Sequence, residues 1–292
     1  ANNNLPARRY ERQLKDLMQA VFEVNAAFGP AYGGQLEALD GVRDNEEAFI
    51  VKTSDIPVVI GEYSTDANVG MGTGTSKSTR FGEMKEIIYT NTPAKYTWSW
   101  AFNEGLDLHT VNNDLNAAVA DRLTLQAQAK VRMMNKHHGQ FISGYAGEEL
   151  ELASMEDKDI LALFNEASVK YADLEVSQRP RAYVTPELFN RIVDLAITTT
   201  GKHSAANIDQ NTIQDFKGFT ITRVATQNFV TDEIAYFAPD NIFKAFTGIN
   251  TSRTIETPDF DGLALQGSGL AGEFGLDDNK KAVFKVKLGS KE

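Results

Sequence analysis

Apolar and polar side chains alternate most regularly in residues 95–102. Four aromatic side chains share one side of this segment, and small or polar ones share the other; the aromatic set is Tyr96, Trp98, Trp100 and Phe102. A period of two is typical of a strand that buries one face. We therefore predict a half-buried strand whose aromatic face packs on another element.

The period becomes helical in residues 113–139. Apolar residues recur there at intervals of three and four; the stripe is Leu115, Ala118, Val119, Ala129 and Met133. Gly139 is a natural terminator for this helix. About 27 residues at 1.5 Å per residue make a rod of about 40 Å. We expect the aromatic face to pack on it through Leu115, Val119 and Met133.

Residues 51–90 predict two strands around a long exposed loop. Residues 56–60 and 86–89 are apolar and β-branched, which favours strands. The segment between them is rich in Gly, Ser and Thr and carries Lys77 and Arg80. Such a composition cannot form a core, and long loops in compact domains are usually functional.

The second half of the chain predicts two helices. The first follows a capping box at residues 154–157, and its apolar face is Ile160, Leu163, Phe164, Ala167 and Tyr171. The second begins at Thr185-Pro186, where proline at the first helical position costs no hydrogen bond. Its apolar face is Leu188, Phe189, Ile192, Val193 and Ala196.

Short strands accompany these helices. They are predicted at 181–184, 218–221 and 234–237, with Pro239 and Gly248 as breaks, and at the end of the chain, where Phe284, Val286 and Leu288 alternate with lysines. Strands, a long helix, a mixed unit and a closing strand indicate an α+β fold.

The first 50 residues contain one short helical stripe, formed by Tyr10, Leu14, Leu17, Met18, Val21 and Phe22. Gly29-Pro30 and Gly33-Gly34 end it. A helix isolated in this way packs either on another subunit or on its own domain, and both alternatives remain open. The polar start of the chain has no apolar region like that of a secretory signal.

Composition excludes several classes of function. The 292 residues are 42% hydrophobic and contain no cysteine, which rules out disulfides, thiolate nucleophiles and cysteine-ligated zinc. The net charge of -11 argues against tight nucleic-acid binding, although an acidic protein can enclose DNA without adhering to it. No apolar run approaches the roughly 20 residues of a membrane span.

No motif in the sequence is a strong signal of a catalytic, phosphate-binding or metal-binding site. Residues 72–78 echo a phosphate-binding loop, but Ser76 replaces the glycine that should precede the lysine, and no helix follows. His137 and His138 are adjacent, so they point about 100° apart on a helix, and we interpret them as solvated helix-end residues. The sequence 259–262 lacks the later glutamate of a calcium loop. We predict no enzyme activity and no catalytic, cofactor or metal site.

The order of these elements resembles that of the major capsid proteins of tailed bacteriophages with the Hong Kong 97-type fold. The resemblance covers nearly the whole chain. Three short sequence segments also resemble that family, at residues 180–189 (PRAYVTPELF), 216–221 (FKGFTI) and 238–256. None of these segments is diagnostic alone, but their order is.

The resemblance implies a division of the chain. The implied parts are an N-terminal arm (1–50), an extended loop (51–90), a peripheral domain with a spine helix (91–150 and 275–292) and an axial domain (151–274). It also implies that the extended loop lies over a neighbouring subunit; the candidate contact residues are Gly70, Gly72, Gly74, Lys77 and Arg80. Some capsids of this fold cross-link through a loop lysine, and we expect no such cross-link from Lys77.

Function and partners are also expectations from the resemblance. The implied protein is a virion component, assembled in the host cytoplasm from hexamers and pentamers into an icosahedral shell around double-stranded DNA, without sequence-specific binding and with scaffolding and portal proteins as partners. The family's N-terminal scaffold segment is either removed before Ala1 or replaced by a separate protein. An encapsulin-type compartment shell is the alternative, and a nucleotide-binding enzyme is a remote one.

Overall fold

The computed structural model describes most of the chain. The described residues are 26–33, 36–38 (backbone only), 47–54, 56, 58–65, 80–82, 84–110, 115–178, 180–199, 210–256 and 260–289. They form two compact units. One is Asn45–Lys95, here called the loop unit, and the other combines Ala1–Asp44 with Tyr96–Glu292 and is called the main unit. The predicted N-terminal helix lies outside the described residues.

The main unit contains a sheet of six strands in the order β5-β12-β9-β6-β8-β7. The strands are β5 (Glu148–Leu152), β6 (Pro180–Val184), β7 (Asp215–Phe216), β8 (Phe219–Arg223), β9 (Glu233–Pro239) and β12 (Phe284–Leu288). Every residue of β9 is buried, because it lies inside the sheet and both faces are covered. The predicted strands of this region are thereby confirmed, and β9 ends at Pro239 as expected.

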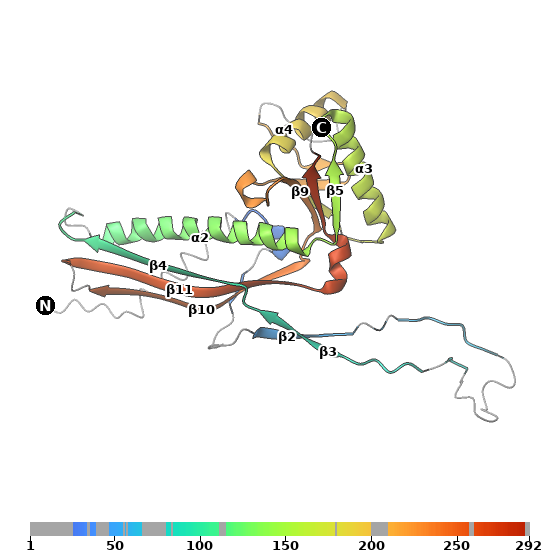
Figure 1. Ribbon diagram of the computed structural model, residues 1–292, viewed down its shortest axis with the longest axis horizontal. Helices are drawn as coiled ribbons and strands as arrows, with labels where there is room; N and C mark the ends of the chain where they lie inside the picture. Colours follow the sequence, from blue (N-terminus) through green and yellow to red (C-terminus); the bar gives the residue numbers. More distant parts are fainter. Residues whose placement is uncertain are drawn as a thin grey trace. The chain divides into compact units, whose positions relative to one another are not determined.

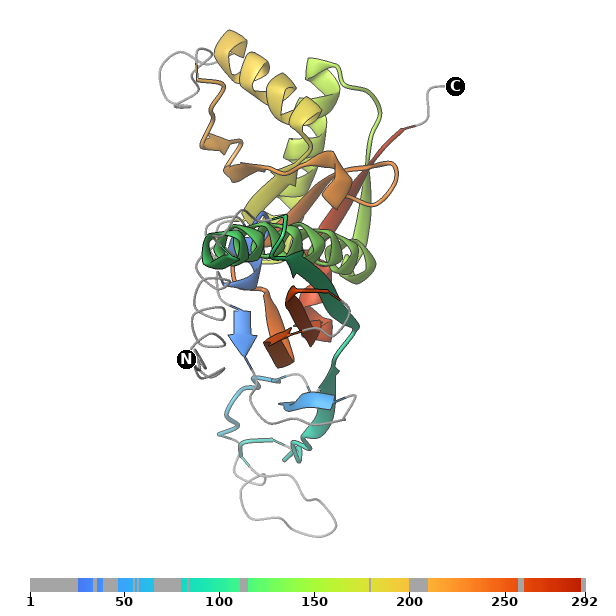
Figure 2. The ribbon, with the colours of Figure 1, turned by 90° about the vertical axis from the view of Figure 1, so that its left-hand side faces the viewer.

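Two helices cover one face of this sheet (Figure 2). They are α3 (Asp157–Asp173) and α4 (Pro186–Thr199), whose first residue is the predicted proline. Phe164 lies at the centre, with its ring edge-on to those of Phe216, Phe219 and Phe237 at 5.0–5.6 Å between centroids. All five predicted apolar positions of α3 are buried. The capping box is wrong: Ser154 instead contacts Asp159, and Glu156 precedes the helix without a side-chain cap.

The other face of the sheet is covered by a short 3-10 helix, η1 (Gly29–Tyr32), and by the end of the long helix α2 (Leu115–Tyr145). Tyr183 and Tyr236 point to this side, because successive side chains of a strand alternate between faces. Both pack in one buried cluster with Phe28 and Ile142.

A second sheet of the main unit has four strands in the order β1-β10-β11-β4. They are β1 (Leu36–Ala38), β4 (Trp98–Asp107), β10 (Phe243–Glu256) and β11 (Gly262–Gly275). The helix α2 runs along this sheet (Figure 1), and Val119 and Leu123 pack on Leu265. The predicted break at Gly248 is wrong, because β10 continues through it with only a register shift between Thr247 and Asn250.

Aromatic rings of β4 lie on glycines of β11. Phe102 is opposite Gly267 and Trp100 is opposite Gly269. A Cβ added at Gly267 would approach the Phe102 ring to 2.4 Å, and one at Gly269 would approach Trp100 to 2.6 Å. A side chain at either position would therefore occupy the volume of the opposite ring. These glycines let the rings lie flat between sheet and helix.

Three of the four predicted aromatic side chains pack on α2, although their partners differ from those expected, and the fourth, Tyr96, contacts Phe246 of β10. Trp98 stacks on His137 with the ring planes 3° apart. The Lys130 ammonium lies 3.8 Å from the centre of the Trp100 ring, a cation–π contact. Only Phe102 joins the apolar cluster with Val119. The predicted stripe was partly wrong, since Ala129 is exposed.

Gly139 does not end α2, which continues to Tyr145. A Cβ at this position would lie 1.8 Å from the carbonyl oxygen of Asn228. That residue ends the 3-10 helix η2 (Thr226–Asn228), which therefore crosses α2 at its glycine. The glycine serves a close approach between two backbones, and the prediction of a helix end was wrong for this reason.

The closing strand β12 pairs with β5 and β9 in the six-stranded sheet. A 3-10 helix, η3 (Asp277–Ala282), leads into it. Phe284 and Val286 are buried, but Leu288 is more exposed than predicted. Alternation shows that a strand buries one face, and it does not show which sheet receives it.

The loop unit is built on a two-stranded antiparallel sheet. Its strands are β2 (Glu47–Thr53) and β3 (Thr90–Lys95), and Thr53 is opposite Thr90. The predicted strands at 56–60 and 86–89 are wrong: the described residues of both segments are without regular structure. Their apolar side chains find no sheet face to pack on, and the pairing lies in the more polar segments outside them.

Candidate assembly surface

Large apolar side chains of the loop unit are exposed to an unusual degree. Val58 is 87% exposed, Ile60 92% and Met84 93%. The remaining exposed members of this set are Ile50, Val59, Tyr63, Phe81, Ile87, Ile88 and Tyr89. We call all ten the apolar set. Monomeric proteins rarely expose so many large apolar residues together in one short segment, and such exposure marks interaction surfaces.

The two sides of the loop unit hold one another by polar contacts. Thr53 and Thr92 share a hydroxyl hydrogen bond of 2.9 Å between the two strands. Further along, the Ser64 N–H donates to the Arg80 carbonyl at 3.0 Å, and the Arg80 guanidinium donates to the Ser64 carbonyl at 3.2 Å. The backbone is thus partly paired within the loop unit. Within the apolar set the rings of Tyr63 and Phe81 meet edge-on at 5.1 Å between centroids, and the set still stays exposed.

Burial of the apolar set would be strongly favourable. Transfer of one Val, Ile or Met side chain from water to a protein interior contributes about 1.5–3 kcal/mol. Three such residues give several kcal/mol to an association before the cost of ordering is subtracted. What this site can do chemically is therefore bind another apolar surface.

Of the predicted contact residues, only Arg80 is described. Gly70, Gly72, Gly74 and Lys77 lie outside the described residues, as does the phosphate-loop echo at 72–78. Arg80 is half-buried and contacts Ser64 of its own unit, so the structure shows a bracing contact for it. Its contact with a neighbouring subunit stays a prediction.

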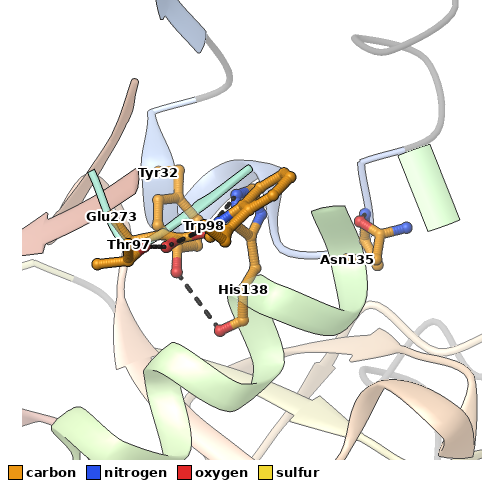
Figure 3. A network of polar contacts seen from close by, with 7 residues as sticks. Tyr32, Thr97, Trp98, Asn135, His138 and Glu273 are labelled. Atoms are coloured by element: carbon orange, nitrogen blue, oxygen red, sulfur yellow. Dashed lines mark hydrogen bonds and ion pairs between the residues drawn. The ribbon is translucent and has the colours of Figure 1, made fainter. Parts of the chain in front are cut away.

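The chain re-enters the main unit through residues 96–98, here called the root segment. Figure 3 shows how it is held by Glu273 of β11. The Thr97 hydroxyl donates to Glu273 Oε2 at 3.0 Å, and the Trp98 indole N–H donates to Glu273 Oε1, also at 3.0 Å. The Thr97 N–H donates to the Ala271 carbonyl. The root segment is thereby fixed to β11 at three points.

A buried histidine lies beside this carboxylate. His138 Nε2 of α2 is 3.7 Å from Glu273 Oε1, and the Tyr32 ring stacks on the imidazole at 4.2 Å (Figure 3). Burial lowers the pKa of His138 to about 3, and the neighbouring His137 adds to the lowering. Burial also raises the pKa of Glu273, against the effect of the hydrogen bonds from Trp98 and Thr97.

The sequence interpretation of these histidines was wrong. His138 is buried and His137 is half-buried under Trp98, so neither is a solvated helix-end residue. The helix continues beyond them, and their neighbours are the sheet and η1. Elsewhere, His109 lies 3.6 Å from Asp261 at the surface, and His203 and Asp259 lie outside the described residues.

Glu273 was not singled out from the sequence. Its partners Thr97 and Trp98 are 176 and 175 positions away along the chain, and no local pattern reveals a pair of that separation. One signal was present: Leu265, Gly267, Gly269, Ala271 and Glu273 alternate along one strand. A lone carboxylate in such a small and apolar series indicates a buried polar contact.

No group of three or more potential metal ligands occurs among the residues that the structure describes. Within the same residues, no helix combines the length and apolar character that a membrane crossing requires.

Comparison with known proteins gives matches to solved structures alone. Neither a family model nor a curated protein matches the chain. The capsid of the cyanophage P-SCSP1u matches with a TM-score of 0.63 at 10% identity, over 88% of this chain and 87% of that one. The mature capsid of bacteriophage PhiM1 matches with a TM-score of 0.64 at 11% identity, over 92% and 88%. A virus-like particle from Pyrococcus furiosus matches with a TM-score of 0.52 at 10% identity, over 95% and 99%.

These matches cover nearly the whole chain, and they define its class of fold. The chain has the mixed helix and sheet fold of phage capsid proteins. The predicted fold resemblance to the capsid proteins of tailed phages is therefore confirmed.

Proposed function

We propose that the protein is the major capsid protein of a tailed bacteriophage, a subunit that assembles with copies of itself into an icosahedral shell. The observation that carries this proposal is a capsid-protein fold whose loop unit exposes the apolar set. A subunit of a closed shell must bury surface against its neighbours, and this unit offers apolar surface for that purpose.

The details extend the proposal. Hexamers and pentamers form the shell, scaffolding and portal proteins assist its assembly in the host cytoplasm, and double-stranded DNA is enclosed in the virion. The net charge of -11 suits a shell into which DNA is driven by a separate motor. The implied N-arm, extended loop, and peripheral and axial domains belong to this proposal. The subunit has no catalytic role in it, and the predicted clamp residues Gly70, Gly72, Gly74, Lys77 and Arg80 contribute to the contact between subunits.

A phage shell is favoured over an encapsulin-type compartment. Five phage structures match with TM-scores from 0.55 to 0.64, whereas the virus-like particle matches with 0.52 and the procapsid of satellite phage P4 with 0.50. In either kind of shell, the surface that the apolar set would contact belongs to a neighbouring copy of this chain.

Electron microscopy and sedimentation of the purified protein test the proposal directly. The wild-type chain should form closed shells, alone or with scaffolding protein. The double variant Val58→Ser and Ile60→Ser should remain folded, because both side chains are exposed in the subunit, and should assemble poorly.

A matched control uses exposed apolar residues outside the loop unit. Val169 on α3 is 60% exposed and Leu125 on α2 is 53% exposed. The double variant Val169→Ser and Leu125→Ser should assemble like the wild type. Equal assembly of both double variants would show that the apolar set is not the contact surface.

A further inference from the structure

The root segment is held by a carboxylate that is almost entirely buried. The side chain of Glu273 is 3% exposed, and the one ionisable base that the described residues place within 4 Å of it is His138. No lysine or arginine there neutralises the carboxylate. Its two oxygens accept hydrogen bonds from neutral donors alone, Thr97 and Trp98.

The neighbouring imidazole of His138 makes no hydrogen bond with Glu273, although it lies beside it. Neither ring nitrogen of His138 makes a hydrogen bond within the described part of the chain, although the side chain is buried. A neutral imidazole has one nitrogen that accepts a hydrogen bond. The nitrogen facing Glu273 is Nε2, at 3.7 Å from Oε1, just beyond hydrogen-bond distance. No hydrogen bond forms between these two atoms at this distance, and in the tautomer that carries its proton on Nδ1 the Nε2 atom is the acceptor.

We propose that Glu273 is a proton-controlled latch on the root segment. As a carboxylate it accepts from both Thr97 and Trp98. When it takes up one proton from water on Oε1, this O–H donates to His138 Nε2 after a small approach of the two side chains. Oε2 then remains as the acceptor for Thr97, and Trp98 keeps only its longer contact with that oxygen, at 3.3 Å.

Protonation of Glu273 weakens its contacts with the root segment and adds a hydrogen bond to His138 on α2. Hydrogen bonds to a charged acceptor are about twice as strong as those between neutral groups. The proton therefore weakens the contacts of Thr97 and Trp98 and satisfies the free nitrogen of His138. Residues 96–98 directly follow the loop unit in the chain, so the protonation state controls how firmly the chain is held at the point where it leaves that unit. An effect on shell assembly rests on the proposed function; the latch itself does not.

Few other ionisable groups surround Glu273. The helix α2 contributes His138 and also His137, which stacks on Trp98. The 3-10 helix η1 contributes Tyr32, whose pKa is raised by burial and by the charge of Glu273. The cross-strand neighbour on β10 is Ala245, which does not titrate. Burial lowers the pKa of both histidines, to about 3 for His138, so the carboxyl group, whose pKa burial raises, takes up its proton before His138 does.

The first test is the titration of Trp98 in the unassembled subunit. The chain has two tryptophans, so the protein shows two indole N–H signals in NMR, and Trp100→Phe assigns them. The Trp98 signal should shift in a step centred above the usual carboxyl pKa of about 4.3. Glu273→Gln should abolish this step, because the amide keeps an acceptor for Thr97 and Trp98 but does not titrate. A step due to His137 would persist in that variant.

The matched control is Glu233→Gln. Glu233 is also buried and accepts from the hydroxyls of Ser143 and Tyr236, but the Lys285 ammonium lies 3.5 Å away. This variant should leave the Trp98 step unchanged. A Trp98 step that survives Glu273→Gln, or no step above pH 4.3 in the wild type, would overturn the latch.

The second test compares melting temperatures of unassembled wild-type and Glu273→Gln subunits. A raised carboxyl pKa means that the folded state binds the proton more tightly than the unfolded state. The wild type therefore loses stability as pH rises from the unfolded pKa through the folded one. Glu273→Gln, which can also donate its amide N–H to His138, should melt higher at pH 8, and its advantage should shrink toward pH 5. An advantage that is equal at both pH values, or absent at pH 8, contradicts the proposal.

These measurements use the isolated subunit, so failure of the latch and failure of the proposed function can be told apart. If the titration occurs but no shell ever forms, the capsid proposal fails and the latch stands. If shells form and Trp98 shows no Glu273-dependent step, the latch fails alone.

Discussion

Gly139 of α2 should be intolerant of even one added methyl group. The Cβ of an alanine would meet the Asn228 carbonyl oxygen at 1.8 Å and the carbonyl carbon at 3.0 Å. Both are backbone atoms, so no side-chain rotation relieves the overlap, and η2 must move away from α2. Overpacking of this kind costs about 1–3 kcal/mol.

The intrinsic preference of the helix acts in the opposite direction. Replacing a helical glycine by alanine stabilises a helix by about 0.5–1 kcal/mol. For Gly139→Ala the overlap outweighs this gain, and we expect a net loss of about 1–2 kcal/mol in the free energy of unfolding. Gly144 is the control: it lies in the same helix, and nothing is within 4 Å of its added Cβ. Gly144→Ala should stabilise the subunit by up to about 1 kcal/mol.

Urea unfolding of the subunit, followed by tryptophan fluorescence, measures both changes. Each kcal/mol should also move the melting temperature by about 2–4 °C. A Gly139→Ala protein at least as stable as Gly144→Ala would refute the close approach of η2 to α2. It would also refute our explanation of why a glycine stands inside this helix.

Four further outcomes follow from the structure. Phe164→Ala should destabilise the subunit by about 3–5 kcal/mol, because the ring is fully buried among three others; a loss under 1 kcal/mol in urea unfolding would contradict that packing. Trp98→Ala should yield insoluble or unassembled protein, whereas a soluble variant with an unchanged melting temperature would speak against its contacts with Glu273 and His137. In Glu273→Gln, stability should fall as pH drops from 6.5 toward 3, because His138 is buried with a pKa of about 3 and takes up its proton more readily when unfolded; a flat profile would argue against its burial. Calorimetric titration with ATP and Mg²⁺ should show no binding, and a micromolar affinity abolished by Lys77→Ala would sink that expectation.

The predictions from the sequence were correct where a single neighbouring layer determines the local periodicity of apolar residues. The aromatic alternation of β4 and the apolar face of α3 are each set by a single neighbouring layer, so a window of ten residues contains the signal. The proline at position 186 marked the start of α4 for an equally local reason: its missing N–H has no role there.

The failures have a tertiary origin. Residues 58–60 and 86–89 have the apolar, β-branched character of strands, yet their large apolar side chains are exposed in the part of the chain that the structure describes. Pairing falls instead on Thr90–Lys95, a segment that contains a proline and an asparagine. A single sequence shows that side chains need burial, and it does not show which surface buries them.

The same limit applies to the root segment. The contact of Glu273 with Thr97 and Trp98 depends on how β11 pairs with β4, and that register is fixed by the whole sheet. Gly139 was interpreted from a local rule about helix ends. Its actual role is set by Asn228, which lies far along the chain. Contacts between segments that are far apart in the chain are therefore what the sequence alone could not predict.

The glycines beneath the aromatic rings of β4 have a consequence for how this chain can change over generations. The Phe102 ring fills the volume that a side chain at Gly267 would need, and a Cβ there would also lie 2.9 Å from the backbone carbonyl oxygen of Thr251. Replacing Phe102 therefore does not by itself free position 267. Related chains should consequently keep glycine at position 267 even where the residue at position 102 differs.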